Sequence, residues 1–413
     1  MSRRRQRPAI AGGAAGRYRD AIASAVVKSR PPMRLRNSLI VLYCTVVSVA
    51  ILYEHQALLP LFARQWGVSP ADVALLTTVT MTPLAVAPLV YGYVLERVSA
   101  RRLLVLGLGV LTAVQFVLAQ GPGYGAFLLL RGLEGLILPA VLTALMTYSS
   151  AIGGPAGARR AITLYIAATI VGGFSGRTFS GVVASYLDWQ AAFWMWSALA
   201  ALALLSTRWL ATDPRADLGR VRWPEVRALI ARPVNRLGFA AAFLLFFVFA
   251  AMMNFLPFRM HQLDPGITQG AVAWVYAGYL VGVVVPLSSL WLIRRLGGER
   301  RTLLAGCAVY LVGLSMLAFG GLPWVYFGMF VFAAGMFTLH SVLSAYLNHL
   351  ETRRKGLVNG LYVSSYYSGG AVGSYLPGVV YEHAGWVPYS LLLFALLILV
   401  GATLWRMPSA GAA

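Results

Sequence analysis

Long apolar runs recur along the whole chain, and they limit the folds that are open to it. Runs of about 18 residues or more are long enough to cross roughly 30 Å of hydrocarbon as a helix. The chain is 59% hydrophobic and 11% charged, with a mean hydropathy of +0.72, which is more apolar surface than one soluble core can bury. We therefore expect an all-α membrane protein with twelve transmembrane helices. The expected spans cover residues 37–62, 72–95, 103–120, 124–150, 160–185, 190–211, 237–262, 270–294, 303–321, 323–350, 357–384 and 386–406.

Basic residues gather in alternate loops of this arrangement. Of the 34 lysines and arginines, 30 fall in the tails and in every second loop, and only Arg64 and Arg259 fall in the loops between them. Loops rich in lysine and arginine stay in the cytoplasm, so both termini are predicted to be cytoplasmic and the membrane to be a bacterial-type inner membrane. Topology thus accounts for the net charge of +21, and nucleic acid is not an expected partner.

The chain divides into five expected segments. They are a basic cytoplasmic tail (1–36), an amino-terminal six-helix bundle (37–211), a cytoplasmic linker (212–236), a carboxyl-terminal six-helix bundle (237–406) and a second cytoplasmic tail (407–413). The first tail lacks the apolar stretch of a cleaved signal peptide. Cys44 and Cys307 lie in spans without a paired spacing, so they are interpreted as packing residues. No metal or cofactor is expected.

An internal repeat relates the two bundles. A shift of 197 positions aligns the fifth expected span with the eleventh and also places Leu59-Pro60 on Leu256-Pro257. The other coinciding residues include Leu164 with Leu361, Gly172 with Gly369, Gly173 with Gly370, Gly176 with Gly373, and Trp189 with Trp386. The halves are therefore predicted to be repeats in the same orientation. The repeated glycines are expected to let helices approach closely.

Parallel six-span repeats around a midplane cavity are used by alternating-access transporters of the major facilitator superfamily. The loop between the second and third spans resembles that superfamily's motif G-x-x-x-D-R-x-G-R-R-R, with Glu96 in place of Asp. The matching residues are Gly92, Glu96, Arg97, Arg101 and Arg102. The resemblance covers residues 37–406, and it implies that these residues form a conformational latch at the cytoplasmic ends of the helices.

Further motifs resemble the efflux branches of the superfamily. Arg131, Glu134 and Gly135 are similar to the motif R-x-x-x-G, which is associated with proton coupling in antiporters. The stretch 53–71 resembles the start of the drug-resistance and arabinose-efflux-like proteins. The fifth span departs from the drug antiporters, since it carries Gly176-Arg177 where they have Gly-Pro. With the Tyr-Tyr-Ser-Gly-Gly sequence at 366–370, this is similar to siderophore efflux proteins such as the alcaligin exporter.

Four charged residues lie well inside the expected spans: Glu54, Arg131, Glu134 and Arg177. Charges in lipid are costly unless paired or hydrated, so each is a functional candidate. Helical rise places Glu54, Arg131 and Arg177 in one layer, roughly 12 to 16 Å from the outer flank, with Glu134 one turn from Arg131 on the same face. A proton-coupling network of all four is therefore geometrically possible, with Glu54 as the proton carrier. The alternative is a buried salt-bridge network that only specifies packing.

Aromatic residues and one histidine are candidates for the substrate cavity. They are Tyr165, His340, Tyr362, Tyr366 and Tyr367, whose faces and hydroxyl groups could contact a substrate. Packing between helices is the alternative for the tyrosines, and a hydrogen bond across helices is the favoured interpretation for His340. His55 points about 100° away from Glu54 on a helix, and it is treated as secondary.

These patterns indicate a secondary transporter rather than an enzyme, because the loops contain no nucleophile-base pair, metal-binding spacing or glycine loop for a nucleotide. We expect proton-driven export of a small organic molecule, siderophore-like or drug-like. Uptake of a small polar metabolite, proton-coupled or facilitative, is the alternative. The expected partners are the substrate, protons and the lipid bilayer, and a monomer is expected.

Overall fold

The computed structural model describes residues 31–152, 154–210, 214, 223–351 and 354–408, which form helices and connecting turns with no strand among them. In the first half the elements are α2 (Pro31–Tyr53), η1 (Gln56–Leu58), α3 (Leu59–Trp66), α4 (Pro70–Arg97), α5 (Ala100–Leu118), α6 (Tyr124–Ala151), α7 (Gly154–Tyr186), α8 (Trp189–Ser206) and η2 (Thr207–Trp209). In the second half they are α9 (Trp223–Ala231), α10 (Pro233–Leu263), α11 (Gln269–Trp274), η3 (Val275–Leu280), α12 (Val281–Leu296), α13 (Glu299–Phe319), α14 (Leu322–Leu350), α15 (Lys355–Ala384) and α16 (Trp386–Trp405).

Twelve long helical segments match the twelve expected spans, with ends that differ by several residues. The first segment combines α2, η1 and α3, and the eighth combines α11, η3 and α12. Among the described residues, eleven helical stretches are long and apolar enough to cross a membrane. The segment that falls short is α15, because it is rich in glycine, serine and tyrosine. Since α15 packs against both α4 and α10, it has little need of an apolar surface all round.

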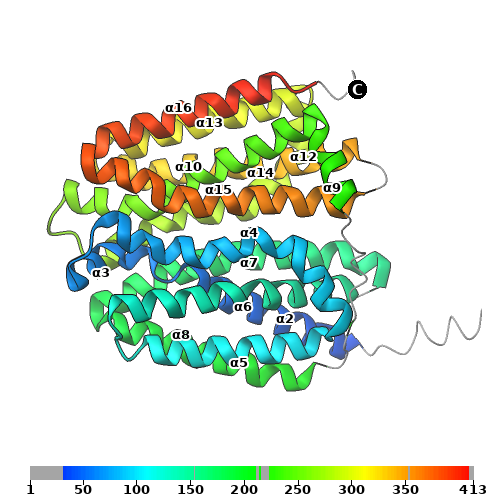
Figure 1. Cartoon of the computed structure of the whole chain (residues 1–413), viewed down its shortest axis with the longest axis horizontal. Coiled ribbons are helices and arrows are strands. Elements are labelled where there is room, and N and C mark those ends of the chain that lie inside the picture. The colour runs from blue at the N-terminus through cyan, green and yellow to red at the C-terminus, as the bar shows by residue number, and fades with distance from the viewer. Residues whose placement is uncertain (1–30, 153, 211–213, 215–222, 352–353, 409–413) are drawn as a thin grey trace, which may run out of the picture.

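The two halves lie side by side along their lengths. Figure 1 shows the first half below and the second half above, with the helices running along the long axis. Helix α4 packs against α15, and α7 packs against α11 and η3, so these pairs form the boundary between the halves. We call the end of the molecule with the start of α2 and the end of α16 the basic end, and the end with α3 the opposite end.

The glycine repeat is visible in the packing. Four glycines each face a backbone carbonyl of a neighbouring helix so closely that a Cβ atom would collide with it. The pairs are Gly172 with Val46, Gly176 with Ala50, Gly369 with Phe243 and Gly373 with Phe247. Adding 197 to both residue numbers of a pair in the first half gives a pair in the second half. The expectation that these glycines allow close helix approach is therefore confirmed, and the same contact joins α2 to α7 and α10 to α15.

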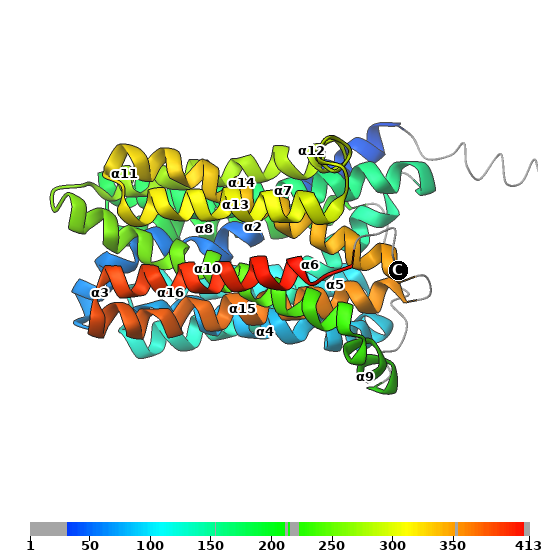
Figure 2. The ribbon, with the colours of Figure 1, turned by 90° about the horizontal axis from the view of Figure 1, so that it is seen from above.

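Part of the expected linker is helical. Within 212–236, the residues 212, 213 and 215–222 lie outside the described part, whereas α9 forms a short helix at the basic end (Figure 2). Glu225 of α9 pairs with Arg354, and Arg232 Nη1 lies 2.7 Å from Glu351 Oε2. These pairs fix the linker to the turn between α14 and α15. Of the expected tails, residues 1–30 and 409–413 also lie outside the described part.

Candidate functional site

The first span is interrupted in the middle of its length. Helix α2 ends at Tyr53, a turn covers Glu54 and His55, and the 3₁₀-helix η1 leads into α3. Pro60 lies in the first turn of α3, where its missing N–H would have no helical partner. The interruption directs the side chains of residues 53–56 towards three separate groups of contacts, described next.

Glu54 belongs to a cluster that is closed off from solvent. We name it the carboxylate cluster; its members are Glu54, Gln115, Arg131 and Glu134, all 0% exposed. Arg131 Nη1 lies 2.5 Å from Glu134 Oε2 and 3.3 Å from Glu54 Oε1. Gln115 Nε2 donates to both carboxylates, at 2.6 Å to Glu54 Oε1 and 2.7 Å to Glu134 Oε1. The cluster therefore holds two carboxylates against one guanidinium.

Arg131 also closes the interrupted end of α2. Its Nη1 donates to the carbonyl oxygen of Ile51 and its Nη2 to that of Leu52, each at 2.9 Å. The last carbonyls of a helix have no partner within the helix, so Arg131 supplies donors that the interruption removes. In the described part of the chain, Glu54 Oε2 and Arg131 Nε are buried without a hydrogen-bond partner.

Arg177 lies apart from the carboxylate cluster. Its guanidinium carbon is 3.9 Å from the ring centre of Tyr53, 4.9 Å from that of Tyr279 and 5.6 Å from that of Tyr276. We call these four residues the arginine cage. Arg177 is 2% exposed, and its Nε donates to Gln56 Oε1 at 2.5 Å. Among the residues that the structure describes, none contributes a carboxylate oxygen within 4.0 Å of the Arg177 nitrogens.

The network of four charges is therefore only partly formed. Glu54, Arg131 and Glu134 come together, whereas Arg177 contacts Tyr53 and Gln56, the chain neighbours of the turn that holds Glu54. The depth estimate assumed a continuous first helix. Because the helix is interrupted at Glu54, residues in one layer of the membrane face different sides of the first span.

A third group of side chains joins the two halves. His55 Nε2 lies 2.8 Å from Thr77 Oγ1, and the amide oxygen of Asn254 accepts from Gln56 Nε2 at 2.7 Å and from Thr77 Oγ1 at 3.1 Å. Asn254 Nδ2 donates to the carbonyl of Ser374 at 3.3 Å. We call His55, Gln56, Thr77 and Asn254 the inter-half network. His55, treated as secondary from the sequence, is a full member of it.

Sequence reasoning did not find Gln56, Thr77, Gln115 or Asn254, because it looked for charges. A buried polar side chain in an apolar span needs a hydrogen-bond partner just as a charge does. All four are 0 to 1% exposed. The amides at 56, 115 and 254, each inside a strongly apolar run, were the signal that could have found them.

The candidate cavity residues of the second half form an aromatic group. The Tyr362 hydroxyl lies 2.9 Å from His340 Nδ1, so His340 does bond across helices. Tyr366 stacks on Phe246 with ring centres 3.8 Å apart, and Tyr367 meets Tyr366 edge-on at 5.4 Å. His340, Tyr366 and Tyr367 are half-buried, whereas Tyr362 is buried. Tyr366 and Tyr367 therefore each keep part of their side-chain surface accessible.

Tyr165 and the latch residues lie elsewhere. The Tyr165 hydroxyl donates to the carbonyl of Leu142 at 3.1 Å, within the first half. Gly92, Glu96 and Arg97 fall in the last part of α4, where the surroundings of the residues lie outside the described part of the structure. Arg101 Nη2 donates to the carbonyl of Arg208 at 3.5 Å, and Arg102 is exposed, with its backbone N–H donating to Ser99 Oγ. The described residues thus place Arg101 and Arg102 at the basic end, beside the end of α8.

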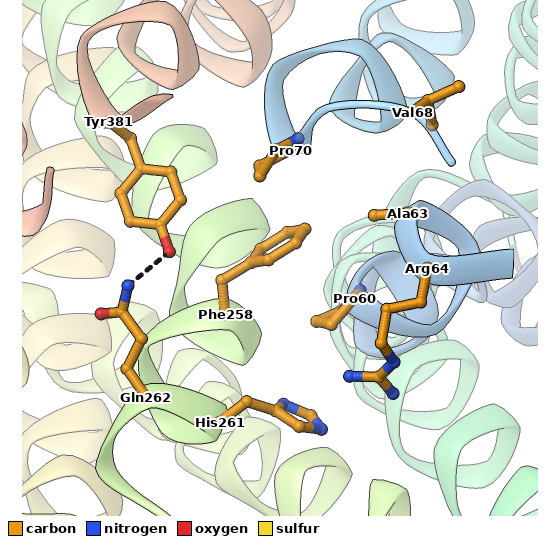
Figure 3. Close-up of a pocket in the computed structure, with 9 residues that line it drawn as sticks. All are labelled: Pro60, Ala63, Arg64, Val68, Pro70, Phe258, His261, Gln262 and Tyr381. Carbon is orange, nitrogen blue, oxygen red and sulfur yellow. Dashed lines mark hydrogen bonds between the residues drawn. The ribbon is translucent and has the colours of Figure 1, made fainter. Parts of the chain in front are cut away.

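A pocket of about 350 Å³ opens between the halves at the opposite end (Figure 3). The side chains that line it are Pro60, Ala63, Arg64, Val68, Pro70, Phe258, His261, Gln262 and Tyr381. Gln262 Nε2 donates to the Tyr381 hydroxyl at 2.8 Å along the wall that the second half contributes. Pro60 and Phe258 lie one helical turn beyond Gln56 and Asn254. The inter-half network therefore lies about one helical turn from the pocket, towards the middle of the molecule.

No described group of three or more His, Cys, Asp or Glu side chains could hold a metal ion. Cys44 and Cys307 are free and buried. Cys44 Sγ lies 3.7 Å from the carbonyl of Ala203, and Cys307 Sγ lies 3.5 Å from that of Leu397. Each thiol thus donates a weak hydrogen bond to a neighbouring helix.

Comparison with known proteins identifies a family and an overall fold. A family model described as the Major Facilitator Superfamily matches residues 39–350 and 263–412. The inner membrane transport protein YnfM of Escherichia coli K12 is 28% identical over 395 residues, which cover 92% of this chain and 93% of YnfM. YybF of Bacillus subtilis, named as an uncharacterized MFS-type transporter, is 26% identical over 361 residues, with 84% and 88% coverage.

Solved structures agree on the fold. The nucleoside transporter NupG superposes with a TM-score of 0.74 at 13% sequence identity. The match covers 91% of this chain and 98% of that one. At this identity the likeness to NupG concerns the arrangement of the helices. The two sequence relatives named above, YnfM and YybF, are both named as transport proteins.

Proposed function

The chain belongs to the major facilitator superfamily, a family of membrane transporters, and we propose that it exports a small organic molecule, siderophore-like or drug-like, in exchange for protons. The observation that carries the proposal is the excess of one carboxylate in the buried carboxylate cluster. A net charge that is fully buried is strongly unfavourable, so the closed cluster holds one proton. Glu54 Oε2 lacks a hydrogen-bond partner, and we assign the proton to it.

Coupling to the substrate follows from the interruption in the first span. Glu54 faces the carboxylate cluster, while Tyr53 faces the arginine cage and Gln56 contacts both Arg177 and Asn254. Loss of the Glu54 proton adds a negative charge next to Arg131, which also holds the end of α2. A shift of this turn moves Tyr53 and Gln56 with it. The proton site thereby changes the cage and the contact between the halves together.

The proposed direction rests on resemblance to efflux proteins. The stretch 53–71 and the Gly176-Arg177 pair resemble efflux branches of the superfamily. Proton-coupled or facilitative uptake is the second candidate, since the superposing NupG is a nucleoside transporter and the same cluster could serve a symporter. We also propose that the membrane is a bacterial inner membrane, that the basic end faces the cytoplasm and that the protein works as a monomer.

The test begins with the substrate. Comparative metabolomics of the medium from a deletion strain and its complemented counterpart should identify a compound whose release depends on the protein. Proteoliposomes are then loaded with that compound, and its flux is measured under an imposed pH gradient of either sign. Export by antiport predicts movement against the proton flow. Movement with the proton flow would instead support symport.

The matched variants are Glu54→Gln and Glu382→Gln. Both remove one carboxylate and keep its size, but Glu54 is buried in the cluster, whereas Glu382 is exposed near the opposite end. Glu54→Gln should lower gradient-driven flux at least tenfold and leave counterflow exchange of substrate measurable. Glu382→Gln should transport normally. Full gradient-driven transport by Glu54→Gln would contradict the assignment of the proton to Glu54.

A further inference from the structure

The buried charge of Arg177 has no carboxylate partner among the described residues. Three aromatic rings surround it, and its nitrogens donate to neutral oxygens, those of Gln56 and of the Gly173 carbonyl. Neutral acceptors and ring faces satisfy the geometry of a guanidinium without cancelling its charge. The cage thus retains a full positive charge in a place where water is excluded, which is the setting that most favours binding of an anion.

The internal repeat indicates that helix packing does not require the charge of Arg177. Arg177 Nη1 donates to the carbonyl of Gly173, one turn earlier, at 2.7 Å. At the equivalent position of the second half, Ser374 Oγ donates to the carbonyl of Gly370 at 2.7 Å. Ser374 and Gly370 lie 197 positions after Arg177 and Gly173. The small hydroxyl of Ser374 therefore makes the same hydrogen bond within its helix as Arg177 does. The fold does not require the charged guanidinium at this position.

The cage lies where the two halves meet. Tyr53 comes from the first span, whereas Tyr276 and Tyr279 come from η3, a 3₁₀ segment within the eighth span. Segments of this kind within longer helices often mark functional hinges. Tyr279 is half-buried, and its ring centre lies 6.0 Å from that of Phe249. Phe249 in turn lies 6.1 Å from Phe246, on which Tyr366 stacks. A chain of ring contacts therefore joins the cage to the half-buried Tyr366 and Tyr367 of the second half.

A second observation points to the same ligand charge. The pocket at the opposite end is lined by Arg64 and His261 and by no acidic residue (Figure 3). It lies one helical turn beyond the inter-half network, and the arginine cage contacts that network through Gln56. The pocket and the cage both lie next to the inter-half network, and both carry basic groups without a carboxylate among their members.

We infer that the transported substrate is an organic anion with a planar or aromatic part, whose anionic group binds Arg177 while its ring lies among Tyr53, Tyr279 and the half-buried tyrosines 366 and 367. This inference rests on the proposed transport function and names the substrate class of that site. The competing explanation is that Arg177 only fastens α7 to the first span, in which case the charge of a ligand makes no difference to its binding.

The test compares two probes that differ only in charge, 2-naphthoate and its neutral amide, 2-naphthamide. Binding to the purified full-length protein in detergent is measured by isothermal titration calorimetry, without any gradient. The unmodified protein should bind 2-naphthoate at least tenfold more tightly than 2-naphthamide. Arg177→Gln should reduce that preference to twofold or less, and Arg177→Lys, which keeps a point charge without the planar fork, should fall between them.

Arg406→Gln is the control, since Arg406 is an exposed arginine at the basic end, and it should keep the tenfold preference. The inference is overturned if the unmodified protein binds neither probe or both equally, or if Arg177→Gln keeps the preference. The comparison of probes on the unmodified protein decides the question even where Arg177→Gln does not fold. Because binding needs no proton gradient, a failure of proton coupling in Glu54→Gln would leave this result unchanged, and the two proposals fail separately.

Discussion

Replacing Arg131 with glutamine should destabilise the protein more than any other single change in the carboxylate cluster. The arginine donates four hydrogen bonds: two to the carbonyls at 51 and 52, one to Glu134 and one to Glu54. Removing it opens the end of α2 and leaves the Glu134 carboxylate buried without a cation, beside the protonated Glu54. Removal of one partner from a buried ion pair costs about 3 to 5 kcal/mol, and we expect a loss of stability in this range.

The charge count predicts which second change restores stability. In Glu134→Gln alone, Glu54 loses its proton and pairs with Arg131, so the change should cost about 1 kcal/mol or less. In the Arg131→Gln background the same change removes the unpaired charge of Glu134, and it should recover about 1 to 3 kcal/mol. The two carbonyls at the end of α2 stay unpaired in the double variant, so recovery is incomplete. The coupling energy between positions 131 and 134 is thus predicted to exceed about 1 kcal/mol.

Reversible unfolding in mixed micelles with a rising fraction of sodium dodecyl sulfate measures these free energies. The four proteins of the cycle are compared with Arg406→Gln, an exposed arginine change that should alter stability by less than about 0.5 kcal/mol. Additive effects of the two changes would refute the charge-balance argument, because the loss at Arg131 would then come from the helix end alone. Equal stability of Arg131→Gln and the unmodified protein would refute the structural role of Arg131 altogether.

Two further predictions concern packing and topology. Gly176→Val places a side chain against the backbone of α2 and should cost about 3 kcal/mol in the same unfolding assay, whereas Gly132→Val, with no neighbouring atom within 4 Å of its Cβ position, should change stability by less than about 1 kcal/mol; equal losses would contradict the close approach of α7. Fluorescent reporter fusions at Ala216 and Ala413 should behave as cytoplasmic proteins, and phosphatase activity from a periplasmic reporter at either site would reverse the proposed orientation.

The sequence predicts the spans well because their physical cause is local. A run of apolar residues must form its hydrogen bonds within itself when lipid surrounds it, so length and composition suffice to place a helix. The repeat adds tertiary information, since paired glycines at one spacing predict one kind of helix contact twice. Gly176 and Gly373 fulfil that prediction in both halves. Even α15, whose composition is less apolar, is among the expected spans, and its match with α7 supports it.

The candidate site is predicted less completely, because side-chain direction depends on backbone details that periodicity does not contain. The expected joining of Glu54 with Arg131 and Glu134 is found. Arg177 is separated from them because the first helix is interrupted, and no count of residues along a continuous helix could show this. Gln56 and Asn254 were not predicted for a different reason. Their amides are neutral, and only charged residues in the spans were taken as candidates for the network.

The interruption of the first span at Glu54 is not explained by Pro60 alone. Leu59-Pro60 recurs as Leu256-Pro257, yet α10 runs without a break from Pro233 to Leu263 with Pro257 inside it. A proline therefore does not suffice to end the helix. The difference lies in the partner: Arg131 donates to the two carbonyls that end α2, and its local counterpart in the second half is the apolar Val331. The arginine that resembles an antiporter motif is thus first a helix cap, and its charge gains a role in transport because the turn it permits brings Glu54 beside it.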